Sequence, residues 1–230
     1  MGEGRGGAVI LADGDFPTSP EPLKILSEAS FVCCCDGAAE KLIAFGRIPD
    51  AIVGDGDSLS PEFKAQYKDI LHTESEQEYN DLTKATRFVI DHFTAPECRA
   101  NICEPLPPLH ITYLGATGKR EDHTLGNISL LSFYKETFDI DVSMFTDYGY
   151  FQACNSGTTT FSSFPRQQVS IFNLTCTAIS ADNLRWQPYA YAQLWQGTLN
   201  EATADSFTVT ADGNYLIYQT YAPKPLSFTP

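Results

Sequence analysis

Basic residues are scarce in this sequence. Its 230 residues include 15 Lys and Arg against 29 Asp and Glu, which leaves a formal net charge of −14 at pH 7. A chain with this charge repels phosphate backbones and anionic lipid surfaces, so the composition argues against nucleic acid and membrane surfaces as partners. For the same reason, a phosphorylated substrate would need a metal ion to offset its charge.

Long apolar runs are absent as well. No stretch of eighteen apolar residues occurs, so the sequence contains no candidate for a membrane-spanning helix. The first residues are rich in Gly, and the apolar stretch Ala8 to Leu11 is too short for the core of a signal peptide. With 43% hydrophobic and 19% charged residues, the composition is typical of a globular protein. We therefore expect a soluble, cytoplasmic protein.

The closely spaced Cys pairs of structural zinc sites are also missing. The chain has seven Cys, and Cys33, Cys34 and Cys35 are consecutive in an apolar run. Neighbouring side chains of a strand point to opposite faces, so we expect these thiols to be reduced and buried. A zinc site around the proline-rich stretch 94–108 would need irregularly spaced ligands, which argues against it; the candidates are His92, Cys98, Cys103 and His110.

The first part of the chain alternates short apolar runs with helix-like stretches, a pattern typical of βα units on a parallel sheet. The expected strands are Ala8–Leu11, Phe31–Cys35, Ala51–Val53, Ile111–Leu114 and Val142–Thr146. The expected helices are Glu21–Glu28, Ala38–Phe45, Asp81–His92 and His123–Thr137. In the third of these helices, apolar residues recur at helical spacing along one face. The sheet should carry helices on both faces.

The last part of the chain has a different texture, rich in Thr, Ser, Tyr and Phe. Alternating segments predict antiparallel strands at Val169–Leu174, Ala190–Trp195, Ser206–Thr210 and Tyr215–Tyr221. Turn residues at Asn155-Ser-Gly157 and Asp212-Gly-Asn214 fit hairpins. The predicted organisation is α/β: a parallel-sheet domain over residues 1–147 and a small antiparallel β domain over residues 148–230.

The densest group of chemically capable residues is Gly54-Asp55-Gly56-Asp57-Ser58, directly after an expected strand. Ligands of α/β sheets bind at the carboxyl ends of strands, and two carboxylates two residues apart suit a hard cation bound through oxygen. An ordinary acidic turn explains the same residues, because Asp and Gly dominate turns. The spacing does not fit a calcium loop, since the sixth residue from Asp55 is Ser60 rather than Gly.

Two further segments are compatible with a phosphate site. Asn80 and Asp81 stand at the start of an expected helix, where either can act as N-cap and Asp81 can also bind a metal. The turn from Gly115 to His123 carries Lys119 and Arg120 towards a helix start, a suitable place for a phosphate. It is not a P-loop, because its spacing is wrong and Arg120 follows the Lys. A solvated basic turn explains these residues equally well.

Five segments taken together resemble the thiamine pyrophosphokinase family, whose members move a diphosphate from ATP to thiamine and release AMP. They occur in family order along nearly the whole chain: Cys35-Asp36-Gly37-Ala38-Ala39, Pro49-Asp50, Gly54-Asp55-Gly56-Asp57-Ser58, Gln77 to Ala85, and Gly115 to Asn127. Each segment alone is weak evidence for the family, whereas five of them in the same order are specific evidence. The resemblance implies an α/β domain followed by an antiparallel β-sandwich, and a homodimer with shared active sites.

The resemblance also implies roles for residues of the first domain. Asp55, Asp57 and Asp81 would hold Mg²⁺, the expected cofactor, which neutralises ATP phosphates and orients the transferred group. Arg120 would contact a phosphate and stabilise charge in the transition state. The other candidates for the ATP pocket are Asp36, Gln77, Lys119, Asp122 and Asn127. Lys119 departs from the family pattern, in which a Gly is common at this position.

The second domain is expected to bind thiamine. A family turn of the Gly-Thr-Ser-Asn type is similar to Gly197-Thr198-Leu199-Asn200, and Leu199 replaces its hydroxyl residue. Tyr218 would stack on the cationic thiazolium ring. A core position in a strand is the alternative explanation of Tyr218. The expected thiamine-binding residues are therefore Thr198, Leu199, Asn200 and Tyr218.

Two other functions are compatible with these residues. An Asp-x-Asp after a strand occurs on several α/β folds, so another Mg²⁺-dependent phosphotransferase or phosphatase is one alternative. A catalytically silent thiamine-binding homologue is the other, against which the complete set of Asp55, Asp57, Asp81 and Arg120 argues. Formation of AMP from ATP would separate the first alternative from diphosphate transfer.

Overall fold

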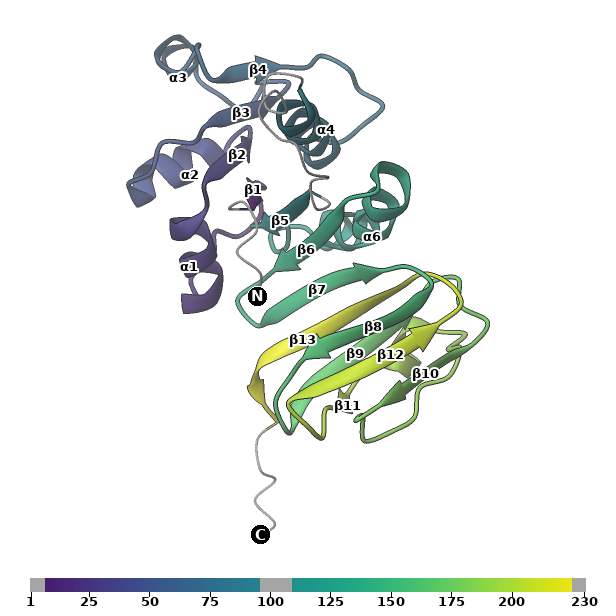
Figure 1. Cartoon of the computed structure of the whole chain (residues 1–230). Coiled ribbons are helices and arrows are strands. Elements are labelled where there is room, and N and C mark those ends of the chain that lie inside the picture. Colours follow the sequence, from purple (N-terminus) through teal and green to yellow (C-terminus); the bar gives the residue numbers. More distant parts are fainter. Residues whose placement is uncertain (1–6, 96–108, 225–230) are drawn as a thin grey trace, which may run out of the picture. The chain divides into compact units, whose positions relative to one another are not determined.

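The computed structural model describes residues 7–95 and 109–224. The chain divides into two compact units, Met1–Ile128 with Ile140–Asp147 and Ser129–Asp139 with Tyr148–Pro230 (Figure 1). Within the described ranges, no helix is long and apolar enough to cross a membrane. Cys98, Cys103 and most of the proline-rich stretch lie outside the described residues.

The first unit is built on a parallel sheet with the strand order β6-β5-β1-β2-β3-β4. Its strands are β1 (Ala8–Leu11), β2 (Phe31–Cys35), β3 (Ala51–Gly54), β4 (Leu71–Thr73), β5 (His110–Leu114) and β6 (Asp141–Phe145). β1 and β2 are buried almost throughout, as expected of parallel strands covered on both faces. The three consecutive Cys of β2 are free thiols and are buried, as predicted.

Helices cover both faces of this sheet, as expected. They are α1 (Pro20–Glu28), α2 (Ala38–Phe45), α3 (Pro61–Gln66), α4 (Asp81–Thr94) and α6 (Glu121–Phe138). Figure 1 shows α1 and α2 on one side of β1–β3 and α4, which packs on β1, β2 and β3, on the other. Right-handed crossovers require this arrangement, because the chain runs from β1 to β4 in one direction and then returns to β5.

Every strand and helix expected in the first part of the chain is present, and two further elements were missed. Helix α3 has no buried residue, so it lacks the apolar stripe by which helices are recognised. Its start signal was present nonetheless: Ser60 is the N-cap, accepting a hydrogen bond from the Phe63 amide, and Pro61 follows. Strand β4 has three residues and lies at the sheet edge.

The second unit is an antiparallel β-sandwich, as expected. One sheet has the order β11-β9-β13-β7 and the other β10-β12-β8. Its strands are β7 (Gly149–Cys154), β8 (Gly157–Ser162), β9 (Gln167–Asn173), β10 (Ile179–Asp182), β11 (Asn200–Glu201), β12 (Ser206–Ala211) and β13 (Tyr215–Pro223). A buried cluster combines residues of both sheets, including Phe161 and Phe207, whose rings stack at 5.0 Å.

Both predicted hairpins are wrong. The turn at Asn155–Gly157 joins β7 to β8, and the turn at Asp212–Asn214 joins β12 to β13, but each pair of strands belongs to two different sheets. Short connections of this kind carry the chain across the core from one sheet to the other. Turn residues specify a reversal of direction, and they do not specify whether the two strands pair with each other.

The predicted strand Ala190–Trp195 is also wrong. This segment is irregular and ends in the 3₁₀ helix η1 (Leu194–Gly197). Its carbonyl at Tyr191 accepts a hydrogen bond from the Asn173 side chain. Tyr191 is buried, while Leu194 and Trp195 are exposed. The alternating apolar residues of this segment therefore do not form a strand: Tyr191 packs into the core by itself, and the later apolar residues stay exposed.

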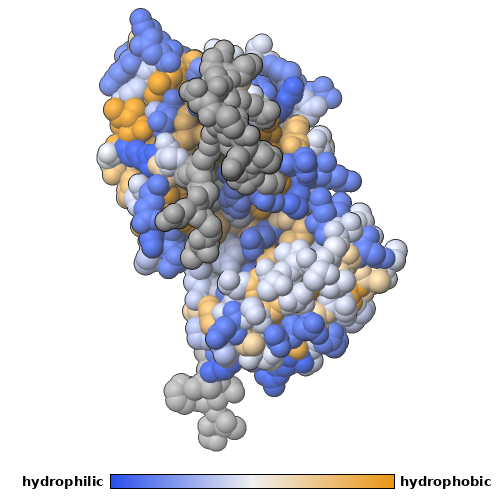
Figure 2. Space-filling model, in the orientation of Figure 1, coloured by the Kyte–Doolittle hydropathy of each residue, from blue (hydrophilic) through white to orange (hydrophobic). Residues whose placement is uncertain are grey.

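The outer faces of β8 and β12 are lined with Thr. Thr158 pairs with Thr210 and Thr160 with Thr208 across β8 and β12, at hydroxyl distances of 3.0 and 2.9 Å. Figure 2 shows an area of nearly neutral hydropathy over these strands. Such cross-strand pairs stabilise a sheet modestly and leave its surface polar without adding charge.

Candidate active site

The loops after β1 and β5 meet at the carboxyl end of the sheet. β1 leads to β2 on one side, and its other neighbour β5 leads to β6, so the two loops leave in opposite directions. Such a switch point is where α/β sheets form ligand crevices. Three backbone hydrogen bonds hold the loops together: Ala12 to Leu114, Gly14 to Gly115 and Asp15 to Thr117, at 2.7–2.9 Å.

A cavity of about 760 Å³ opens at this end of the first unit. Its lining comes from the loops after β1, β2, β3 and β5, from the segment before α4 and from the first turns of α4 and α6. It includes the predicted residues Asp36, Asp55, Asp57, Gln77, Asp81, Lys119, Arg120 and Asn127. The structure thus brings together side chains that are up to ninety-one positions apart (127 − 36) in the sequence.

An acidic group occupies one part of this cavity, and its deepest member is Asp36. Asp36 is buried, and both of its carboxylate oxygens accept the Gly56 amide at 3.2 Å. A Cβ at Gly54 would overlap the Asp36 carboxylate, so glycine is required there. Asp36 itself has a φ of +31°, in a region that L-residues rarely adopt. We define the acidic group as Asp36, Asp55, Asp57 and Asp81.

Crowding of like charges changes the protonation of this group. Burial, followed by the negative charge of Asp81, raises the pKa of Asp36 to about 6, and Asp55 adds to the effect. The pKa of Asp55 lies below its ordinary value, chiefly because it accepts the Asp57 amide. A divalent cation bound beside Asp36 would lower its pKa again, because a positive charge favours the ionised carboxylate.

Lys84 supplies an internal positive charge beside the acidic group. Its side chain is 4% exposed, and its Nζ lies 3.6 Å from Asp81 Oδ1 and 3.4 Å from the Glu74 carbonyl oxygen. Lys84 lies one turn into α4, on the face that includes Asp81, because residues three apart share a helix face. Helix α4 thus presents a carboxylate and an ammonium group to the same cavity.

The basic side of the cavity comes from the loop after β5. Arg120 pairs with Asp122 through Nε–Oδ1 and Nη2–Oδ2 contacts of 3.1 and 2.6 Å. The hydrogen bonds that Arg120 donates to Asp122 raise the pKa of Arg120 above its ordinary value. Asp122 therefore orients Arg120 without lining the cavity itself. Lys119 lines the cavity next to Arg120 with a φ of +56°.

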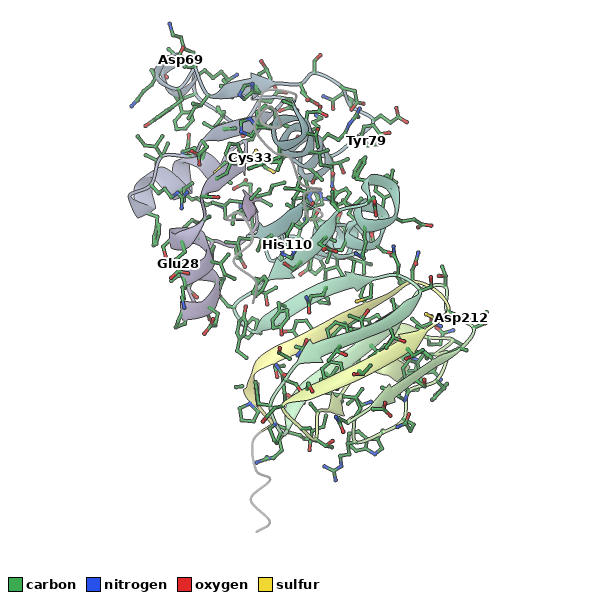
Figure 3. The ribbon with its side chains drawn as sticks, in the orientation of Figure 1. Glu28, Cys33, Asp69, Tyr79, His110 and Asp212 are labelled. Atoms are coloured by element: carbon green, nitrogen blue, oxygen red, sulfur yellow. The ribbon has the colours of Figure 1, made fainter. Side chains whose placement is uncertain are left out.

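Polar and aromatic side chains complete the rim. Asn80 is the N-cap of α4, accepting the Thr83 amide at 3.0 Å, and it contacts Asn127 at 3.5 Å. Asn127 donates to the Ala116 carbonyl at 2.8 Å, which ties α6 to the loop after β5. Tyr79, labelled in Figure 3, lies on the segment before α4 with Arg87 5.1 Å from its ring centre.

Sequence reasoning missed several residues that line or support the cavity. Asp13 follows β1 as Asp55 follows β3, so the same rule about carboxyl ends of strands would have identified it. Lys84 lies in α4, which the sequence predicts as a helix, but the apolar periodicity of a helix does not reveal that a lysine in it is buried. Lys41 of α2 pairs with Asp13 in the loop after β1. No local sequence pattern predicts this contact, because the two residues are far apart in the chain.

The donor chemistry of the acidic group fits a magnesium ion. Across residues 7–95 and 109–224, no three His, Cys, Asp or Glu side chains are gathered closely enough to hold a metal by themselves. Mg²⁺ keeps several waters and completes its shell with substrate phosphates, so the carboxylates need not form a complete site before the phosphates bind. Oxygen donors, together with the raised pKa of Asp36, therefore suit an ion that arrives with a phosphorylated ligand.

The residues predicted to bind thiamine lie in the second unit. Asn200 on β11 and Gln219 on β13 are both paired with Val169 on β9. Leu199 and Tyr218 directly precede these two residues, so they lie at the same level along the sheet, on either side of β9. Leu199 has a φ of +68° and is 65% exposed. The side chain of Asn200 is buried and bonds the backbone of Trp186.

Tyr218 belongs to an aromatic strip, which we define as Tyr218, Phe151 and Phe172. Its ring lies 4.6 Å from that of Phe151, which faces it across β7 and β13, and Phe172 lies 6.2 Å from Phe151. These rings are half-buried, whereas Val169 and Ile217 on the other face belong to the core. Thr198 donates to the Trp195 carbonyl at 2.7 Å, so its hydroxyl is used within the turn.

Comparisons with known proteins agree over both units. Residues 23–142 match the family described as "Thiamin pyrophosphokinase, catalytic domain", and residues 149–218 match "Thiamin pyrophosphokinase, substrate-binding domain". The chain is 36% identical over 90 residues to "Thiamine pyrophosphokinase 3" of Oryza sativa subsp. japonica, a match that covers 37% of this chain and 31% of that protein. The chain thus spans about a third of the length of this curated relative.

Solved structures show the same fold. A thiamin pyrophosphokinase from Candida albicans superposes with a TM-score of 0.74 at 19% identity, covering 92% of this chain and 89% of that one. A thiamine pyrophosphokinase from Bacillus subtilis superposes with a TM-score of 0.73 at 18% identity, covering 94% of this chain and 99% of that one. The order of an α/β unit and an antiparallel β unit is therefore shared with these proteins.

The raised pKa of Asp36 predicts an unusual dependence of stability on pH. An Asp in the unfolded chain loses its proton near pH 3.8, whereas folded Asp36 keeps it to about pH 6. The folded state binds more protons in this window, so raising the pH through it destabilises the metal-free protein. We expect Asp36→Asn to raise the thermal midpoint by roughly 2–4 °C at pH 7.5, about 1 kcal/mol after solvent screening, and to have no such effect at pH 4.

Asp69→Asn serves as the control, because Asp69 is exposed and does not line the cavity. Calorimetric midpoints at both pH values in the presence of EDTA check the prediction. A variant of Asp36 that is less stable than the wild type at pH 7.5 would contradict it.

Proposed function

This chain belongs to the thiamin pyrophosphokinase family, and we propose that it transfers a diphosphate group from ATP to thiamine. The observation that carries the proposal is the cavity of the first unit, whose lining combines four carboxylates with Lys119 and Arg120. A metal–phosphate complex needs this combination, since the ion requires oxygen donors and the phosphates require cationic donors.

The proposed reaction exchanges one P–O bond for another. The hydroxyl oxygen of thiamine attacks the β-phosphorus of ATP, and the bond from that phosphorus to the oxygen bridging the α-phosphorus breaks. AMP leaves with the bonding electron pair, the hydroxyl loses its proton, and thiamine diphosphate is formed. Positioning and charge stabilisation account for most of the catalysis in transfers of this kind.

We propose Mg²⁺ as the cofactor, with Asp55, Asp57 and Asp81 as its protein ligands. The ion would neutralise charge on the phosphates when bound. Asp36 supports the same site, because burial and the neighbouring charge of Asp81 raise its pKa to about 6, and a cation would offset both effects. Arg120 pairs with Asp122 through Nε and Nη2, and its remaining N–H groups would donate to the transferred phosphates. Gln77, Lys119 and Asn127 contribute further polar contacts to ATP.

The second unit is proposed to bind thiamine. Tyr218 offers a half-buried ring within an aromatic strip, and a cationic heterocycle stacks favourably on such a face. Leu199 adds an exposed apolar side chain held in a left-handed backbone conformation. Thr198 and Asn200 shape this turn through their contacts with Trp195 and Trp186.

The function predicts AMP as the product. Purified protein with ATP, Mg²⁺ and thiamine should release AMP and thiamine diphosphate, and EDTA should abolish both. Asp57→Asn should keep the fold and lower kcat by at least about a hundredfold, because a lost ligand removes charge stabilisation in the transition state. Asp69→Asn, on the far side of the first unit from the labelled Tyr79 in Figure 3, should retain normal kcat. Release of ADP instead of AMP would exclude diphosphate transfer.

Tyr218→Ala is expected to raise the KM for thiamine by about three- to thirtyfold, the value of a ring–cation contact, and to leave the KM for ATP unchanged. Tyr218→Phe keeps the ring and should keep the wild-type KM. Steady-state kinetics with each substrate varied in turn check this prediction. An increase confined to the KM for ATP would show that the two units had been assigned the wrong substrates.

We also propose a homodimer in which the first unit of one subunit and the second unit of its partner form each active site. The resemblance to the family supports this arrangement. Exposed apolar side chains on the second unit also support it, because surface groups of this size are unusual in the absence of a partner: Trp186, Tyr189, Leu194, Trp195 and Leu199.

Mixing two damaged variants tests the shared site. Asp55→Asn and Tyr218→Ala, unfolded, mixed in equal amounts and refolded, should gain about a quarter of wild-type activity at low thiamine above the activity of the two variants refolded separately. Random assembly makes half of the dimers mixed, and each mixed dimer then has one intact site of two. No recovery, with mixed dimers verified by mass spectrometry of differently tagged chains, would show that each subunit builds its own site.

A further inference from the structure

A cluster of three charged side chains lies beside the acidic group of the cavity. The Asp13 carboxylate stands between two ammonium groups: Oδ1 is 2.7 Å from Lys41 Nζ, and Oδ2 is 3.1 Å from Lys119 Nζ. Asp13 comes from the loop after β1, Lys41 from α2 and Lys119 from the loop after β5. One carboxylate with two ammonium groups leaves the cluster with one positive charge in a chain whose net charge is −14.

The two lysines are held differently. Lys41 Nζ also donates to the Gly14 carbonyl at 2.8 Å, so its ammonium is tied to the loop that carries Asp13. For Lys119 Nζ, Asp13 is the one carboxylate within ion-pair distance among the described residues. Its side chain is 48% exposed and it lines the cavity. An ammonium group has three donors, so Lys119 can serve Asp13 and a ligand together.

Asp13 is well placed to remain ionised while it does this. Although burial opposes its charge, hydrogen bonds from Lys41 and Lys119 outweigh that effect and lower its pKa below the ordinary value. The carboxylate also faces the start of α2, where a Cβ added to Gly37 would lie 3.3 Å from Asp13 Oδ2. Backbone amides at a helix start favour a negative charge.

Lys119 occupies its position at a conformational cost. Its φ of +56° lies in the left-handed region, which disfavours a residue with a Cβ. Just before it, Gly118 also has a positive φ, and a Cβ there would overlap the Asp15 carboxylate. The loop is therefore packed tightly against the loop after β1. Strain retained in the wall of a cavity is a reason to seek a function for the residue that bears it.

Resting on the proposed function, we propose that Asp13 is a positioning residue that holds Lys119 against a phosphate of ATP on the β1–β5 side of the cavity. The acidic group follows β2 and β3 and begins α4, so the metal and the Lys119 contact engage different parts of the phosphate chain. The contact recognises phosphate and not the nucleoside. Lys41 fixes the other oxygen of Asp13 and keeps the carboxylate turned towards Lys119.

The first test is removal of Lys119. Calorimetric titration should show that Lys119→Gly binds MgATP about tenfold more weakly, as expected for one lost charge-assisted hydrogen bond. Magnesium tripolyphosphate, which has no nucleoside, should lose the same factor. The matched control is Asp139→Gly, because Asp139 is exposed, has a φ of +51° and does not line the cavity. It relieves the same backbone strain and should leave both affinities unchanged.

The second test separates positioning from a general effect of charge. Asp13→Asn should weaken MgATP binding about fivefold in the wild-type background and less than about twofold in the Lys119→Gly background, since Asp13 acts through Lys119. Asp15→Asn removes the same charge from the same loop, outside the cavity lining, and should not weaken binding. Asp13→Glu, which keeps the carboxylate, should recover part of the lost affinity.

The outcomes distinguish this proposal from the proposed function. Equal weakening by Asp13→Asn in both backgrounds would mean that Asp13 supports the fold and does not position Lys119. Tighter binding by Asp13→Asn, or a loss confined to MgATP and absent with tripolyphosphate, would also overturn the proposal. If the wild type forms AMP while any of these results is found, diphosphate transfer stands and the role of Asp13 falls. If the expected binding pattern is found but no thiamine-dependent AMP is formed, the role of Asp13 stands and the proposal of diphosphate transfer falls.

Discussion

Repulsion among carboxylates at the end of a parallel sheet is the constraint on which the first unit depends. β2 and β3 are neighbours, so their carboxyl ends bring Asp36 and Asp55 together, and α4 adds Asp81. The fold reduces the resulting repulsion with the Gly56 amide and with the buried ammonium of Lys84, and the pKa of Asp36 is still raised to about 6. A structure selected for stability alone would not gather these charges, and this is the physical basis of our proposal that the group holds a cation.

A second constraint is the close approach of two loops at the switch point. A Cβ at Gly14 would overlap the carbonyl oxygens of Gly115 and Thr117, so the backbones can meet only where the side chain is absent. Their hydrogen bonds bring Asp13 within reach of Lys119, and a positive charge is thereby held near the negative ones. The separation of opposite charges within one cavity follows from strand order, since acidic residues follow β2 and β3 and the basic residues follow β5.

The second unit is stabilised by an apolar and aromatic core between two sheets rather than by balanced charges. It has few charges, and its two sheets are joined by short turns that cross a core containing Phe161 and Phe207. The outer face of the β11-β9-β13-β7 sheet carries aromatic rings instead of the Thr pairs of the other sheet. Aromatic side chains on a sheet face are suited to a flat ligand, and polar Thr pairs are suited to water. The two outer faces of this unit therefore differ in their chemistry.

The sequence by itself determined most elements of the first unit, the class of its sheet and the segments after β2, β3 and β5 that carry most charged residues of the cavity lining. Periodicity reports burial within one helix or strand, and the motifs after β2, β3 and β5 carry their chemistry locally. Only the tertiary structure decided that Asn155–Gly157 and Asp212–Asn214 connect different sheets and that residues 190–195 form no strand. It also decided that Lys84 is buried and that Asp13 lies between Lys41 and Lys119. These features depend on which distant segments become neighbours, and the free energy of such contacts is absent from any local pattern of residues.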